Sequence, residues 1–194
     1  MAKKAAKTAK AAKAPKAAKA PSPRVLISTA KIQERIKELA RQISDDYRGQ
    51  TLYAVCVLED GFMFMADLVR HLDVPVICQF IKPEAREVEQ GGGKSTEIFF
   101  SPEVNVQGGN VLLVQALVET GVTSEFLMRN LVARGAATVK LATLLDRHTS
   151  RRISLQPEYS GFRLDEQYVF GYGLGAPQLK RNLPYLAAKS RATG

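Results

Sequence analysis

The sequence predicts an α/β protein with a doubly wound, mostly parallel sheet and a small cap contributed by the N- and C-terminal ends of the domain. Short, mostly apolar runs occupy 52–58, 111–114 and 138–145, as expected for strands buried on both faces of a parallel sheet. Segments with apolar residues three and four positions apart lie between them and are typical of amphipathic helices. This alternation favours a sheet covered by helices on both faces.

The domain is expected to begin with a short strand at 25–28 and a charged helix. Ser28 or Thr29 can cap this helix, because its side-chain oxygen can accept a hydrogen bond from the first helical turn. The apolar stripe of the helix consists of Ile32, Ile36, Leu39, Ala40 and Ile43. Its spacing predicts that one side of the helix packs on the core.

A second helix is expected at 62–72, and its Met and Phe side chains are predicted to belong to the core rather than to a cofactor site. A further strand is expected at 74–81. The polar segment 82–95 contains three consecutive glycines and has the composition of a long mobile loop. Phe99 and Phe100 are expected to end a strand that precedes the central unit.

The central unit is 110–135, which has the pattern of a buried strand, a short loop and a helix. The buried face of the helix is expected to contain Phe126, Leu127, Leu131 and Val132. Gly135 is its expected C-cap. The loop from Glu119 to Thr123 brings backbone N–H groups and two hydroxyls to a helix N-terminus, which suits an anion. A Thr-Gly pair between a strand and a helix is common in α/β proteins, so the loop alone is weak evidence for a phosphate site.

The C-terminal part of the chain has a different character. Strand 138–145 is followed by Asp146, Arg147 and His148, and the remainder contains short runs rich in Tyr, Val and Phe with glycine breaks. These runs, at 159–175 and 181–188, predict a small cap rather than another strand–helix–strand unit.

The charge of the chain is concentrated at its start. The sequence has 194 residues and a net charge of +9, and the first 22 residues contain seven Lys and no acid. A Lys/Ala/Pro segment of this kind cannot bury enough apolar surface to fold, so residues 1–23 are expected to be a disordered tail. The tail either contacts nucleic acid nonspecifically or serves only as a solubilising extension. Residues 24–189 are the expected domain, and 190–194 a disordered C-terminus.

The remaining composition favours a cytoplasmic protein. No apolar run approaches the length of a membrane span. Cys56 and Cys78 both lie in apolar runs, so buried reduced thiols are expected rather than a disulfide. His71 and His148 have no His or Cys at the spacing of a structural zinc site.

From about Val25 to Leu186 the sequence resembles the hypoxanthine-guanine phosphoribosyltransferases of purine salvage, which have a type I phosphoribosyltransferase fold. The stretches that carry the resemblance are IQERIKELARQISDDYRG, GFMFMADLVRHL, ARGAATVKLATLLDR, YSGFRLDEQYVFGYGL and RNLPY. The resemblance implies transfer of ribose 5-phosphate from phosphoribosyl pyrophosphate to hypoxanthine or guanine, with Mg²⁺, to give IMP or GMP. It also implies a homo-oligomer.

The resemblance assigns roles to individual residues. The 5-phosphate loop falls on Thr120, Gly121, Val122 and Thr123. Glu119 stands where the family has an aspartate that exchanges a proton with the purine. Arg147 replaces a lysine that hydrogen-bonds the purine oxygen, Tyr168 is the stacking aromatic, and the backbone of Val169 meets the edge of the base.

Several positions depart from the pattern of the family. Gln115 and Ala116 replace two adjacent carboxylates, and Gly175 replaces another metal-binding acid, so no metal ligand is predicted. The pyrophosphate loop, ordinarily Leu-Lys-Gly, begins here with Leu58 and Glu59 and continues with Asp60 and Gly61. The pyrophosphate-binding arginine is retained as Arg181. The Ser-Tyr pair of the family's closing loop is absent between residues 81 and 96.

Two hypotheses follow from this mixture. In the first, the chain is a purine phosphoribosyltransferase with weakened catalysis, which requires Mg²⁺. In the second, it is a catalytically silent relative that binds a purine nucleotide as a sensor or regulator, with the Lys tail contacting nucleic acid.

Overall fold

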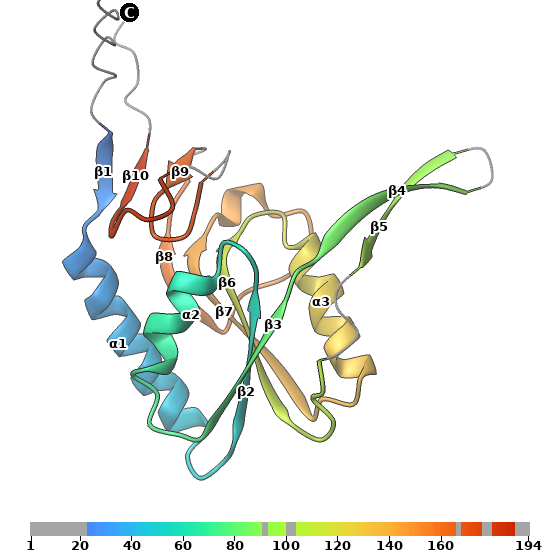
Figure 1. Cartoon of the computed structure of the whole chain (residues 1–194), viewed down its shortest axis with the longest axis horizontal. Coiled ribbons are helices and arrows are strands. Elements are labelled where there is room, and N and C mark those ends of the chain that lie inside the picture. Colours follow the sequence, from blue (N-terminus) through green and yellow to red (C-terminus); the bar gives the residue numbers. More distant parts are fainter. Residues whose placement is uncertain (1–22, 91–92, 100–103, 166–167, 176–179, 189–194) are drawn as a thin grey trace, which may run out of the picture.

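The computed structural model describes residues 23–90, 93–99, 104–165, 168–175 and 180–188. Its centre is a parallel five-stranded sheet with the strand order β3-β2-β6-β7-β8. The strands are β2 (Leu52–Val57), β3 (Val76–Ile81), β6 (Asn110–Val118), β7 (Thr138–Asp146) and β8 (Tyr159–Arg163). Helices α1 (Thr29–Asp46) and α2 (Phe62–Val69) cover one face, and α3 (Val122–Ala133) covers the other (Figure 1). The predicted doubly wound α/β fold is confirmed.

Two hydrophobic cores lie on the two faces of the sheet. Alternate residues of β6 face opposite sides: Leu112 and Val114 belong to the core under α1 and α2, whereas Val111 and Leu113 belong to the core under α3. Strands buried on both faces are therefore mostly apolar, which is the pattern by which the sequence predicted them.

Helix α1 matches its prediction at both the cap and the buried stripe. Ser28 is the N-cap, and its Oγ accepts a hydrogen bond from the backbone N–H of Lys31 at 3.4 Å. The five apolar residues predicted for the stripe are the buried residues of the helix. The agreement follows from the strict spacing of the stripe, since no other side of this helix could face a core.

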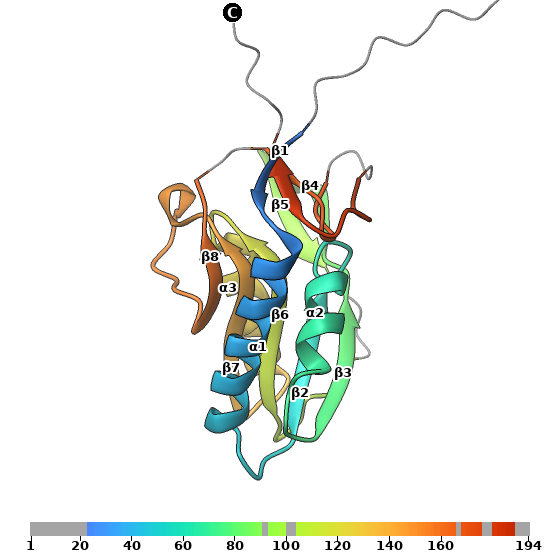
Figure 2. The same cartoon turned by 90° about the vertical axis from the view of Figure 1, so that its left-hand side faces the viewer.

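The cap is a separate antiparallel sheet made from both ends of the domain. Strand β10 (Leu186–Ala188) lies between β1 (Arg24–Ile27) and β9 (Val169–Phe170). Figures 1 and 2 show this sheet above α1 and α2, at the end of the molecule that carries the N-terminus of α3. The prediction was wrong for 159–163, because this segment is not part of the cap. It forms β8, which pairs in parallel with β7 at the edge of the central sheet.

A partly buried carboxylate connects the cap to the helices. The hydroxyl of Tyr172 donates a hydrogen bond to Asp67 on α2, and Gln33 Nε2 on α1 donates to the same carboxylate at 2.7 Å. Burial alone would raise the pKa of Asp67, but the hydrogen bonds from Tyr172, Gln33 and Arg70 outweigh it and lower that pKa. Tyr172 is thus held in place. Its neighbour Gly173 is hydrogen-bonded through its backbone N–H to the carbonyl of Arg181.

A second polar cluster lies at the start of β7. Tyr159 Oη donates to Asp46 Oδ2 at 2.5 Å, and Lys140 Nζ donates to the same oxygen at 3.0 Å. The ammonium of Lys140 also lies 5.0 Å from the centre of the Tyr47 ring. The hydrogen bonds from Tyr159 and Lys140 lower the pKa of Asp46. The cluster ties the end of α1 to two strands of the sheet.

The predicted mobile loop at 82–95 is wrong for most of its length. Strand β4 (Glu84–Gln90) pairs antiparallel with β5 (Gly93–Phe99), and the hairpin extends away from the body of the molecule (Figure 1). The sequence argument weighed polarity and glycine and overlooked Val88, Thr96 and Ile98, whose branched side chains favour strands. Phe99 ends a strand as predicted, whereas Phe100 lies outside the described residues.

The two cysteines differ in exposure, so one of the two expected buried thiols is wrong. Cys56 on the central strand β2 is fully buried, and burial raises the pKa of its thiol to about 12. Cys78 is exposed, because β3 is the edge strand of the sheet. Neither forms a disulfide, as predicted.

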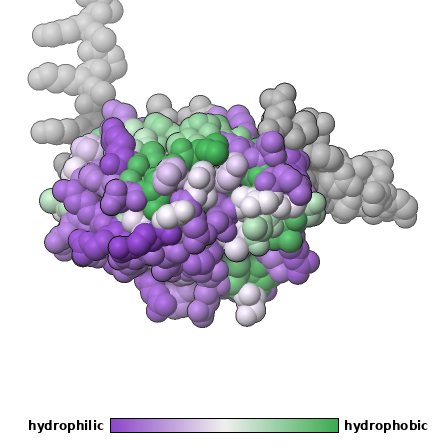
Figure 3. All heavy atoms as spheres, turned by 90° about the horizontal axis from the view of Figure 1, so that it is seen from below, coloured by the Kyte–Doolittle hydropathy of each residue, from purple (hydrophilic) through white to green (hydrophobic). Residues whose placement is uncertain are grey.

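The ends of the chain were predicted from composition alone. Apart from Pro23, the tail 1–23 lies outside the described residues, as does the C-terminus 190–194. Among the described segments, no helix combines the length and the apolar character that crossing a bilayer requires. Seen from the end opposite the cap, hydrophilic residues predominate on the surface and hydrophobic ones gather in smaller areas (Figure 3).

Candidate functional site

The loop after β6 has the geometry expected of a phosphate site. Gly121 has φ +83° and ends the loop as the N-cap of α3, so its left-handed conformation favours glycine. Thr120 Oγ1 accepts a hydrogen bond from the N–H of Val122 at 3.4 Å. Val122 and Thr123 are exposed in the first turn of α3, whose leading N–H groups lack acceptors within the helix. All four predicted phosphate-binding residues therefore lie together at a helix N-terminus that favours an anion.

Residues 151–153, which follow β7, pack against the loop at Thr120 and Gly121. The N–H of Arg152 donates to the carbonyl of Thr120 at 3.0 Å. A Cβ at Gly121 would lie 3.0 Å from Ile153 Cγ1 and 3.1 Å from Arg151 Cδ, so any side chain at this position would crowd the support. The loop thus has little room for rearrangement.

Arg151 is held in turn by a buried ion pair with Asp146. The side chains of Arg151 and Asp146 are only 12% and 7% exposed. The sequence analysis did not assign either residue to the site. A signal was available, since Asp146 ends a buried strand and two adjacent arginines follow within six residues.

Two residues predicted for different roles, Glu119 and Arg147, contact each other. The guanidinium of Arg147 donates to Glu119 Oε1, and the side chains are 9% and 47% exposed. The N–H of Arg147 also donates to the carbonyl of Val118 at 3.0 Å, which joins the ends of β6 and β7. Glu119, predicted to exchange a proton, and Arg147, predicted to bind the purine, therefore neutralise part of each other's charge in this structure.

Tyr168 and Val169 lie in the cap rather than on the central sheet. Val169 is the first residue of β9 and pairs with Ala188. Tyr168 precedes it and is 71% exposed, so its ring is not part of the core. Its stacking role and the contact of Val169 with the base remain predictions.

Two of the residues predicted to bind pyrophosphate, Glu59 and Arg181, form a cluster of opposite charges with Asp60 and Lys82. Leu58 and Glu59 follow β2. Arg181 Nη1 lies 2.8 Å from Asp60 Oδ1 and 3.7 Å from Glu59 Oε2. Lys82, at the end of β3, donates to Glu59 Oε1 at 3.1 Å. Burial raises the pKa of Asp60, although the charge of Arg181 opposes the shift. The sequence analysis missed Lys82, which could have been found because β2 and β3 end side by side.

The three positions at which the family resemblance implies metal-binding acids offer no carboxylate for a magnesium ion. Gln115 is 7% exposed and accepts a hydrogen bond from Ser124 Oγ at 2.5 Å, so its amide oxygen is engaged by α3. Ala116 is 2% exposed within the core, and Gly175 offers only its backbone. Mg²⁺ is usually bound through carboxylate oxygens together with substrate phosphates. In the part of the chain that the structure describes, no three side chains of Asp, Glu, His or Cys gather to hold a metal ion.

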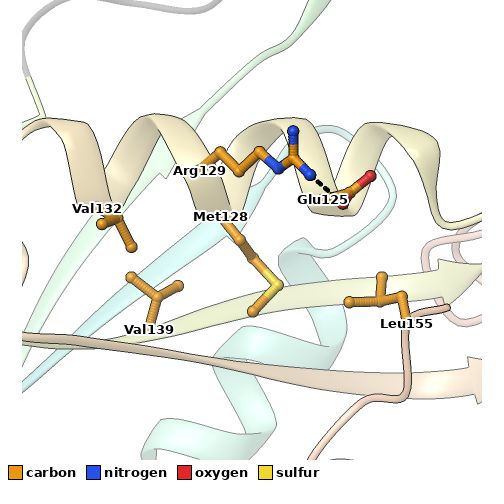
Figure 4. A pocket seen from close by; sticks show the side chains of 6 residues that line it. All are labelled: Glu125, Met128, Arg129, Val132, Val139 and Leu155. Carbon is orange, nitrogen blue, oxygen red and sulfur yellow. Dashed lines mark hydrogen bonds and ion pairs between the residues drawn. The ribbon is translucent and has the colours of Figure 1, made fainter. Parts of the chain in front are cut away.

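A hydrophobic pocket of about 340 Å³ lies outside this site. Met128 and Val132 of α3, Val139 of β7 and Leu155 line it, and the ion pair of Glu125 with Arg129 lies at its edge (Figure 4). It contains none of the predicted site residues. Val132 is 56% exposed here, so its predicted burial is wrong, whereas Leu127 and Leu131 are buried as expected and Phe126 is partly buried. 

The comparisons with known proteins agree with this arrangement. A family model described as the phosphoribosyl transferase domain matches residues 28–178. The fold and the loop at the N-terminus of α3 thus belong to the phosphoribosyltransferase class.

Individual relatives define the family more closely. The hypoxanthine-guanine phosphoribosyltransferase of Streptococcus pneumoniae is 34% identical over 165 residues, which are 84% of this chain and 91% of that protein. The corresponding protein of Bacillus subtilis is 29% identical over 163 residues, again 84% of this chain and 91% of that protein. A crystal structure of a hypoxanthine-guanine phosphoribosyltransferase from Bacillus anthracis has 35% identity and a TM-score of 0.74, and covers 84% of this chain and 95% of that one. The chain belongs to the hypoxanthine-guanine phosphoribosyltransferase family.

Proposed function

We propose that this chain binds a purine nucleoside monophosphate, IMP or GMP, and has little or no capacity for phosphoribosyl transfer. The observation that carries the proposal is a contrast at one edge of the sheet. The loop Thr120–Thr123 retains the backbone and hydroxyl groups that suit a phosphate, whereas the residues at the three acid positions provide no carboxylate.

Binding requires the phosphate loop and the groups around the base. The 5-phosphate would accept hydrogen bonds from the first N–H groups of α3 and from the hydroxyl of Thr123. Arg147 carries five N–H donors, so it can donate to a purine oxygen and still contact Glu119. Tyr168 is exposed on the cap beside Val169 and has an aromatic face suited to stacking on a base.

Transfer chemistry requires more than these groups provide. The two adjacent carboxylates of the family would accept hydrogen bonds from the ribose hydroxyls, and each such bond to a charged group contributes about 1.5 to 3 kcal/mol. The loss of both removes roughly 3 to 6 kcal/mol, which lowers the rate by roughly 10² to 10⁴ if the loss is felt in the transition state. Glu119 still offers a carboxylate, but this carboxylate is engaged in an ion pair with Arg147.

A weakened transferase is the second candidate, and the position of Glu119 favours it. This carboxylate lies at the carboxyl end of β6, directly before the phosphate loop, and is 47% exposed. The relatives are named for transfer to hypoxanthine and guanine, so residual turnover with Mg²⁺ present would place this chain with them.

The experiment measures binding and turnover on the same full-length protein. Titration calorimetry with GMP and with IMP is expected to give micromolar affinity. Substitution of Thr123 by Val is expected to weaken GMP binding roughly threefold to tenfold through the loss of one hydrogen bond. Thr29→Val at the start of α1 is the matched control and is expected to leave binding unchanged.

Turnover is measured as IMP or GMP formed from the base, phosphoribosyl pyrophosphate and Mg²⁺. A rate within tenfold of about 10 per second, the median for enzymes, would refute the proposed loss of transfer. Absence of binding by either nucleotide would refute the proposed ligand. Turnover reduced by roughly 10² to 10⁴ together with micromolar nucleotide binding would select the weakened transferase, whereas micromolar binding with turnover below this range would select the proposed nucleotide-binding function.

A further inference from the structure

The cluster of Glu59, Asp60, Lys82 and Arg181 lies at the same edge of the sheet as the phosphate loop. Glu59 and Asp60 directly follow β2, and β2 is the hydrogen-bonded neighbour of β6, whose end leads into that loop. Lys82 follows β3 on the other side of β2. The cluster is therefore one strand away from the place where a phosphate would bind.

The backbone of the cap holds Arg181 next to Glu59 and Asp60. The N–H of Gly173 donates to the carbonyl of Arg181 at 2.9 Å. A Cβ at Gly173 would lie 2.5 Å from the carbonyl oxygen of Asp60, so the backbone at Gly173 in the cap packs directly on the backbone at Asp60. The side chain of Arg181 is 21% exposed, and its guanidinium points to carboxylates supplied by the protein itself.

The charges of this cluster cancel. Among the residues that the structure describes here, two cations, Lys82 and Arg181, are matched by two carboxylates, each of which contacts at least one of the cations. An incoming anion would have to displace these carboxylates or lie beside them, and both alternatives cost interaction energy. By contrast, Glu119, the acid next to the phosphate loop, is paired with Arg147.

We propose that Glu59 and Asp60 act as built-in counter-anions that set the specificity of the site for ligands with a single phosphate. Their carboxylates take the place of an anion next to Lys82 and Arg181. A ligand that carries a diphosphate on its ribose in addition to the 5-phosphate is therefore rejected. The inference rests on the proposed function for the identity of the accepted ligand, a purine nucleoside monophosphate, but the rejection of diphosphate can be measured without it.

The test uses inorganic pyrophosphate as the probe, in calorimetric titrations of the full-length chain without divalent cations. The double variant Glu59→Gln and Asp60→Asn retains the shape of both side chains and uncovers two cations. It is expected to bind pyrophosphate at least roughly tenfold more tightly than the unmodified chain, since a hydrogen bond to a charged group is regained. Addition of Arg181→Gln to this variant is expected to remove the gain.

A matched control separates this effect from the general increase in positive charge. Glu38 contacts Arg35 at 2.7 Å and Asp45 contacts Arg48 at 2.5 Å, both on the surface of α1 or directly after it. The double variant Glu38→Gln and Asp45→Asn changes the net charge by the same amount and also removes the carboxylate partner of two arginines. It is expected to leave pyrophosphate affinity unchanged, and an equal gain in this control would overturn the inference.

Two further outcomes are decisive. A double variant at positions 59 and 60 that melts as a folded protein but gains no pyrophosphate affinity refutes the inference, even if the unmodified chain binds GMP. If that variant does not fold, competition on the unmodified chain decides: excess pyrophosphate is expected not to displace GMP or bind by itself, and binding or displacement would overturn the inference. Failure of GMP to bind would instead refute the proposed function and leave the pyrophosphate comparison valid.

Discussion

The buried ion pair of Asp146 with Arg151 offers a direct test of how the phosphate loop is supported. Replacement of Arg151 by Met keeps much of the volume of the side chain but removes its charge. The carboxylate of Asp146, only 7% exposed, would then be left without the guanidinium that neutralises it. A buried charge without its counter-ion is strongly destabilising, so the variant isolates the electrostatic part of the support.

The expected magnitude follows from the burial of both partners. Removal of one member of a buried pair costs about 3 to 5 kcal/mol, a large part of a total stability of about 5 to 15 kcal/mol. The double variant Asp146→Asn and Arg151→Met removes both charges and is expected to recover part of this loss. Coupling between the two positions is therefore expected to exceed about 1 kcal/mol.

The assay is equilibrium unfolding in urea, followed by circular dichroism. Arg129→Met is the matched control, because Arg129 pairs with Glu125 on the surface of α3 and is 78% exposed. Its expected cost is below about 1 kcal/mol, as for other exposed pairs. The reasoning is refuted if Arg151→Met costs no more than the control, or if the losses in the double variant simply add.

Three other predictions follow from the described residues. Cys78 is expected to react with a thiol reagent in the native protein, whereas Cys56, buried and with its pKa raised to about 12, reacts only after unfolding. Gly121→Ala is expected to destabilise the protein by at least about 1 to 2 kcal/mol and to weaken GMP binding, since φ is +83° and the new Cβ would meet Ile153. Asp46→Asn is expected to lower stability near neutral pH, and its effect is expected to fade below about pH 4.

The outcomes that would contradict these predictions differ. Modification of two thiols per native chain would refute the assigned burial, and Cys78→Ser is the control that should abolish native reactivity. Equal GMP affinity for the Gly121 variant would show that the loop tolerates a side chain. For Asp46 the native pKa lies below the unfolded value, so its contribution is present above the unfolded pKa and is lost as the pH falls through the native one. A deficit for Asp46→Asn that persists unchanged in acid would contradict this sign.

Sequence reasoning succeeded where one local pattern decides the structure. The stripe of α1, the apolar strands of the sheet and the Thr-Gly loop each depend on the spacing of neighbouring residues, and all three are present. It failed where the outcome depends on position in the sheet. Cys78 lies in an apolar run like that of Cys56, but β3 is an edge strand, and all its residues except Ile81 are at least partly accessible. The hairpin of β4 and β5 was missed because polar composition was taken as evidence against a strand.

The sequence by itself determined the fold class and the Thr-Gly loop, and it places Gln115, Ala116 and Gly175 where the family resemblance implies acids, because each depends on which residue occupies a position in a local pattern. Only the tertiary structure decided how the remaining charges are paired. Arg181 with Asp60 and Arg147 with Glu119 are brought together from distant parts of the chain by the packing of the cap and the order of the strands. Spacing along a chain does not specify such contacts, since the energy of an ion pair depends on distance and burial in space.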